Sequence, residues 1–151
     1  MGFAERLIPF DFAIPGVKLG LSNAVVLAAM YVLSFWDCLA LVLMKCVFGA
    51  ALSGSMGAFI FSVSGGLLSL CCMYVLYRAA GSVFGPVGIS VAGAVSHNTG
   101  QIAAAAFVMR TARIAYYLPV LVVSGVAAGV LVGLTVKPML TAVKYLRDKY
   151  T

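Results

Sequence analysis

Long apolar runs, separated by short polar or glycine-rich breaks, occupy most of the chain from residue 18 to residue 140. Runs of about 20 apolar residues are long enough to cross a bilayer as α-helices. The breaks, at residues 53–57, 81–86 and 110–113, carry turn residues or positive charges. The pattern predicts five complete membrane spans, at residues 18–36, 37–54, 58–78, 87–109 and 117–140.

A short apolar segment precedes these spans. Residues 1–8 are apolar apart from Glu5 and Arg6, and Pro9 ends the run. The segment is too short to span a bilayer and lacks the apolar core of a signal peptide. We expect a truncated first helix or a genuine half-helix here. The fold class predicted for residues 1–151 is therefore an all-α integral membrane protein, a helical bundle in a single transmembrane domain.

Composition and charge support this class and add an orientation. Apolar residues make up 64% of the chain and charged residues 9%, whereas soluble domains carry about a quarter charged residues. No basic stripe with interleaved aromatic residues suggests nucleic acid, so the +6 charge favours contact with membrane lipid. Five basic residues lie on the side of the C-terminal tail, against three on the other side. Positive charge favours the cytoplasmic side, so we expect a multi-pass protein of the cell membrane with a cytoplasmic C-terminus.

Lys45 lies in the middle of the second apolar run with no acid beside it. A cation at the centre of a bilayer costs roughly 2.5–3.5 kcal/mol, so such residues usually face a ligand, a partner or the protein interior. A site for an anionic or strongly polar molecule is the first interpretation. A structural hydrogen-bonding partner within the bundle and a lysine that extends to the headgroups are the alternatives.

Further polar side chains fall within the predicted spans. His97 and Gln101 are four residues apart and therefore share one helix face. Asn23 and the pair Ser62 and Ser64 lie in other spans, so several polar groups could converge on one cavity. The alternative is a polar clamp between helices that binds nothing.

Two other patterns allow two interpretations each. Pro15 and Gly16 predict a stiff entry into the first span, where Lys18 lies at the outer mouth of a cavity or binds lipid headgroups. Gly125, Gly129 and Gly133 recur every four residues on one helix face. Such a stripe permits close packing within the bundle or self-association of two chains.

Several longer motifs resemble one membrane family. The strings are PGVKLGLSN at residues 15–23, FSVSGGLLS at 61–69, VGISVAGAVSHNTGQ at 87–101 and YYLP at 116–119, together with Lys45 and Gly49. They resemble heptaprenyl diphosphate synthase component I, also called the Gx transporter family. That family is similar to the S components of energy-coupling factor transporters, which are six-helix proteins that bind vitamins or related metabolites. The resemblance implies a six-helix, S-component-like architecture whose first helix is mostly missing from residues 1–8.

The resemblance also completes the expected site. Positions that match the family motifs or contribute polar groups to the spans form the predicted substrate-binding set: Lys18, Asn23, Lys45, Ser62, Ser64, His97, Asn98 and Gln101. The partners it implies are a small-molecule substrate and either energy-coupling transporter subunits or the catalytic subunit of a prenyl synthase. No metal or other cofactor is expected.

Catalysis by this chain alone is not expected. Prenyl chain elongation needs paired carboxylates to hold magnesium on a diphosphate, because hard cations prefer oxygen ligands. The only acids are Glu5, Asp11, Asp37 and Asp148, and no two are adjacent. No phosphate-binding P-loop motif is present. The sequence therefore predicts a non-enzymatic transport protein that binds and takes up a small polar or anionic metabolite. A non-catalytic synthase component and a structural assembly subunit remain the alternatives.

Overall fold

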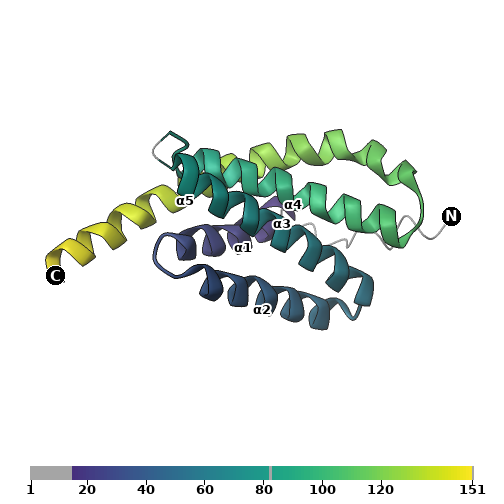
Figure 1. The fold of residues 1–151 in the computed structure, drawn as a ribbon, viewed down its shortest axis with the longest axis horizontal. Coiled ribbons are helices and arrows are strands. Elements are labelled where there is room, and N and C mark those ends of the chain that lie inside the picture. The colour runs from purple at the N-terminus through teal and green to yellow at the C-terminus, as the bar shows by residue number, and fades with distance from the viewer. Residues whose placement is uncertain (1–14, 82, 151) are drawn as a thin grey trace.

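The computed structural model describes residues 15–81 and 83–150, and within them the chain forms five α-helices and one short 3-10 helix (Figure 1). The elements are α1 (Pro15–Met30), α2 (Phe35–Ser53), α3 (Met56–Ala80), α4 (Pro86–Val108), η1 (Ala112–Tyr117) and α5 (Leu118–Tyr150). The described residues contain no strand. The all-helical prediction is thus confirmed for this part of the chain. The partial helix predicted at residues 1–8 lies outside it.

The first predicted span ends earlier than expected, at Met30 instead of residue 36. A turn at residues 31–34 follows, and the Asp37 carboxylate accepts hydrogen bonds from the Ser34 backbone N–H at 3.2 Å and from its hydroxyl at 2.7 Å. These bonds satisfy polar groups at the start of α2. The capping residues therefore assign Phe35 and Trp36 to α2, although both are apolar and continue the preceding run.

Turn residues mark the next two boundaries as the sequence predicted. Gly54 ends α2 with φ at 61°, a left-handed conformation that glycine adopts without a steric penalty. Pro86 begins α4, where its missing N–H would have no helical partner. The last helix, by contrast, continues ten residues past its predicted end, so the basic tail is helical. Figure 1 shows this end of α5 projecting beyond the other helices.

The helices pack in chain order, and α1 also packs against α5, which closes the bundle. Fully buried side chains, one from each of the five α-helices, form the core: Leu27, Val42, Leu70, Ile89 and Val136. The glycine stripe on α5 faces α4. A Cβ at Gly129 would lie 2.6 Å from the Cα of Val91, and one at Gly133 would clash with the backbone of Val87. Packing within the bundle, the first interpretation of this stripe, is confirmed.

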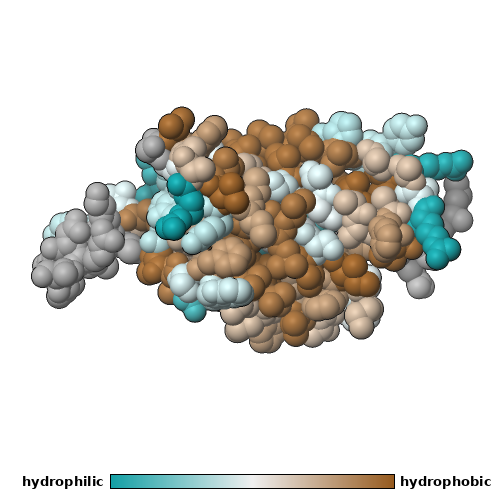
Figure 2. Space-filling model, in the orientation of Figure 1, coloured by the Kyte–Doolittle hydropathy of each residue, from teal (hydrophilic) through white to brown (hydrophobic). Residues whose placement is uncertain are grey.

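The surface is apolar over the middle of the bundle. Large side chains such as Trp36, Phe48 and Phe107 are exposed, and Figure 2 shows hydrophobic residues over most of the visible face, with hydrophilic residues mainly towards its ends. Three stretches of the described helices are long and apolar enough to cross a membrane: Phe35–Ser53, Met56–Ala80 and Ala112–Ala142. This surface and these stretches indicate a membrane protein. α1 and α4 are not among these stretches. α1 has only 16 described residues, and the polar stretch around His97 lowers the hydropathy of α4.

Candidate functional site

Lys45 forms a hydrogen bond with a neutral amide. Its Nζ donates to Oδ1 of Asn23 at 2.9 Å, and this bond joins the middle of α2 to the middle of α1. Both side chains are half-buried. No carboxylate pairs with Lys45 among the side chains that the structure describes. The ammonium group is therefore held by a polar group but keeps its positive charge uncompensated by a described neighbour.

His97 and Gln101 share one face of α4, as their spacing predicted, and this face lies against α3. Both contact the backbone of α3 at Gly65, where a Cβ would lie 2.7 Å from Gln101 Cγ and 3.1 Å from His97 Nδ1. Gly100 makes the same approach possible from α4, since a Cβ there would lie 2.9 Å from Gly65 Cα. Two facing glycines thus bring α3 and α4 close together. This close approach fixes the position of the imidazole.

The His97 side chain is only 7% exposed, and its Nδ1 has no hydrogen-bond partner in the described part of the chain. Buried polar atoms without partners are rare and costly, and this one lies against the α3 backbone at Gly65 with no open space beside it. Gly66 on α3 packs against Cys46, the residue after Lys45 on α2, while the adjacent Gly65 packs against His97 on α4, so Lys45 and His97 lie at the same level of the bundle. The structure therefore brings Lys45, Asn23 and His97 into one region of the bundle, with Gln101 one helical turn from His97.

Asn98 lies apart from this group. Its Nδ2 donates to the Leu121 carbonyl at 2.6 Å, and it also lies close to Gly125, so its amide packs against α5. Adjacent residues on a helix differ by about 100° in direction, which explains why Asn98 and His97 meet different neighbours. In this structure Asn98 joins α4 to α5, and nothing brings it to Lys45.

For the remaining predicted residues the structure shows the helix to which each belongs but no bond to Lys45 or His97. Ser62 and Ser64 are half-buried on α3, and Ser62 lies one turn before Gly65. Lys18 belongs to the first turns of α1, and its side chain is outside the described part. The sequence interpretation missed Ser69, which is 3% exposed and has no partner for its Oγ in the described structure. Its position four residues after Gly65, on the same face of α3, is the signal that could have identified it.

The group formed by Lys45, Asn23, His97 and Gln101 offers mainly hydrogen-bond donors and one positive charge. This chemistry suits an anionic or polar molecule. Among the described residues, no three His, Cys, Asp or Glu side chains are grouped to hold a metal ion.

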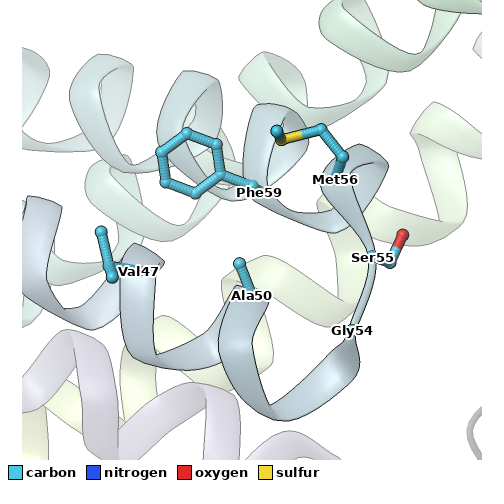
Figure 3. A pocket seen from close by; sticks show the side chains of 6 residues that line it. All are labelled: Val47, Ala50, Gly54, Ser55, Met56 and Phe59. Carbon is cyan, nitrogen blue, oxygen red and sulfur yellow. The ribbon is translucent and has the colours of Figure 1, made fainter.

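A cavity of about 370 Å³ is found elsewhere, at the turn between α2 and α3 (Figure 3). Six residues, most of them apolar, line the cavity: Val47, Ala50, Gly54, Ser55, Met56 and Phe59. None of the predicted site residues is among them. This cavity and the polar group around Lys45 are therefore two separate features of the bundle.

Comparison with known proteins identifies the family. The family model described as heptaprenyl diphosphate synthase component I matches residues 1–139, which includes every helix named above except the end of α5. No curated protein and no solved structure matches the chain. The matched range contains the whole of the predicted binding set. The chain therefore belongs to the heptaprenyl diphosphate synthase component I family.

Proposed function

We propose that this protein binds a small polar or anionic metabolite within the membrane and mediates its uptake. The observation that carries the proposal is the bond from Lys45 to Asn23. A lysine kept in a bundle for structure alone would be expected to have a carboxylate partner, because pairing offsets part of the cost of burying the charge. A neutral amide positions the ammonium group and leaves its charge available to an anion.

His97 and Gln101 would supply the remaining contacts. The imidazole of His97 can accept or donate a hydrogen bond, depending on the tautomer, and a ligand would reach its Nδ1 only after the ring had turned away from Gly65. Gln101, one turn away on the same face of α4, adds an amide that can do both. A ligand with one anionic group and a nearby hydroxyl, amine or carbonyl group would satisfy this set.

Transport rather than chemistry is proposed because the chain has few groups that could catalyse a reaction. Its four acidic residues are scattered along the sequence, which disfavours a magnesium-diphosphate site in this chain. Uphill uptake would require an ATP-hydrolysing partner, since the sequence has no P-loop motif. Energy-coupling transporter subunits are the partners proposed for that role.

The family description supports a second candidate function. It names a component of a heptaprenyl diphosphate synthase, which implies a separate catalytic subunit as partner. In that role the chain would hold the partner at the membrane and would not itself catalyse the reaction. Co-purification with a prenyl synthase catalytic subunit, and a rise in its activity on addition of this chain, would favour this function over uptake.

The test of the binding site compares the purified wild-type protein with two variants. Native mass spectrometry first identifies any co-purified small molecule, and its thermal stabilisation of each protein is then measured. Lys45→Met should lose roughly 2–5 kcal/mol of binding free energy, the range for truncating one member of a buried charged pair. Gln101→Leu should lose about 1 kcal/mol, because it removes a neutral hydrogen bond. Equal stabilisation of the wild type and Lys45→Met would remove Lys45 from the site.

A further inference from the structure

The buried face of α2 opens at Gly49. Three residues on this face are no more than 1% exposed: Cys38, Val42 and Cys46. Gly49 follows Val42 by seven residues and Cys46 by three, so it belongs to the same face of the helix. Gly49 is nevertheless exposed, and a Cβ there would meet no atom of the described structure within 4 Å. We call this open space the Gly49 gap. It lies on the side of α2 that packs against the bundle.

Close packing does not explain a glycine at this position. In the middle of α3, α4 and α5, a Cβ would come within 3.0 Å of a neighbouring atom at every glycine: Gly65, Gly66, Gly93, Gly100, Gly125, Gly129 and Gly133. Those glycines let two helices approach each other. Gly49 has neither such a described neighbour nor a left-handed backbone, although glycine weakens a helix interior relative to alanine. Its missing side chain therefore leaves space open.

The Gly49 gap lies beside Lys45. The two residues are four apart on α2, so they are neighbours on its surface, about 6 Å apart along the helix axis. The Lys45 ammonium group is held towards α1 by Asn23 at 2.9 Å. Gly49 is on the side of Lys45 towards the turn at Gly54, the end of the bundle that we expect outside the membrane. A molecule that enters from outside would therefore reach the gap before the charge.

Ser62 on α3 lies at the level of the gap. Gly66 on α3 packs against Val42 and Cys46 on α2. The two helices run in opposite directions from the turn that joins them, so one turn before Gly66 corresponds to one turn after Cys46 (Figure 1). Ser62 and Gly49 occupy these positions, and Ser62 is half-buried. A hydroxyl that can donate and accept a hydrogen bond thus lies on the face of α3 next to the gap.

We propose that the Gly49 gap holds the body of the ligand whose anionic group binds Lys45, and that Gly49 limits the size of this body. The proposal rests on the uptake function above, because Lys45 supplies the charge. The ligand is then a small anion with its charged group directed inwards, its body against the backbone at Gly49, and a polar group near Ser62. Position 49 determines specificity, since any side chain there would occupy the space of the ligand.

The first test measures whether the gap is open to water. The full-length Gly49→Cys protein in vesicles should react with 2-sulfonatoethyl methanethiosulfonate, an anionic thiol reagent that does not cross the membrane, added on the outer side. Ala51→Cys is the matched control, because Ala51 is exposed on the opposite face of α2 and should be covered by lipid. The labelling of the four native cysteines in the wild type is subtracted. Equal labelling of the two variants would overturn the proposal.

The second test measures whether the charge of Lys45 acts in the gap. Lys45→Met should slow the reaction of Gly49→Cys with the anionic reagent by about tenfold, because a positive charge concentrates anions in a confined space. It should not slow the reaction with the cationic 2-(trimethylammonium)ethyl methanethiosulfonate. An unchanged ratio of the two rates would overturn the proposal for the gap. The thermal-stabilisation test of Lys45 described above is independent of this result, so failure of the gap and failure of the uptake function are distinguishable.

The third test measures the effect of size at position 49. The side chain of Gly49→Leu enters open space, so this variant should unfold like the wild type. It should lower the rate at which the anionic reagent labels Ser62→Cys by about tenfold or more, because the added side chain fills the gap. Ala51→Leu adds the same side chain on the opposite face and should leave that rate unchanged. An unchanged rate in Gly49→Leu, or a loss of stability that shows the space to be closed, would overturn the proposal.

Discussion

The hydrogen bond between Lys45 and Asn23 predicts a specific pattern of stability changes in the absence of ligand. Asn23→Leu removes the acceptor at 2.9 Å and leaves the ammonium group half-buried without it. A hydrogen bond to a charged group contributes about 1.5–3 kcal/mol, so this variant should lose that much free energy of unfolding. Lys45→Met should be near neutral or stabilised, because the cost of burying the charge, roughly 2.5–3.5 kcal/mol at a bilayer centre, disappears with the bond.

The double variant separates this bond from other effects. In the Lys45→Met background Asn23→Leu should cost little, since both polar partners are then replaced by apolar groups. The coupling free energy should be about 1.5–3 kcal/mol. Reversible unfolding of all four proteins by a denaturing detergent measures it. The matched control is Asn98→Leu, because Asn98 bonds to α5 instead, and its cost should be the same with and without Lys45. A cost of Asn23→Leu that is equal in both backgrounds would refute the reasoning.

Three further predictions concern packing, capping and orientation. Gly129→Ala should lose about 1–3 kcal/mol of stability, because its Cβ would lie 2.6 Å from the α4 backbone, whereas Gly49→Ala, with nothing within 4 Å, should be nearly neutral in the same unfolding assay. Asp37→Ala removes the bonds that begin α2 and should cost about 0.5–2 kcal/mol; unchanged stability would contradict the capping role. A reporter fused after Thr151 should be cytoplasmic and one inserted at Gly54 external, since Figure 1 shows the end of α5 and the turn between α2 and α3 at opposite ends of the bundle, and the opposite labelling would invert the topology.

The sequence was sufficient for features that depend on local chemistry. Apolar run length predicted five helices, and turn residues such as Gly54 and Pro86 marked two of their boundaries correctly. The spacing of His97 and Gln101 predicted their shared face, because four residues complete about one helical turn. The predicted end of the first span was wrong, since Ser34 and Asp37 form a helix cap within a stretch that is apolar on both sides.

Features that depend on which helices become neighbours could not be predicted from spacing. The partner of Lys45 comes from a different helix, and several polar residues were equally eligible in the sequence. The direction of Asn98 is set by the packing of α5, which only the folded bundle fixes. The spacing of Ser69 from Gly65 indicates only its face of α3, because Gly93, against which its hydroxyl is buried, belongs to a different helix.

The bond between α1 and α2 also has a consequence for the way this protein enters the membrane during synthesis. A helix carrying Lys45 at its centre is a poor substrate for insertion by itself, because the translocation machinery must release a cation into lipid. The four residues at 31–34 join α2 to α1, so Asn23 is available to the lysine as soon as both helices have left the ribosome. We expect α1 and α2 to leave the translocation channel together as a helical hairpin.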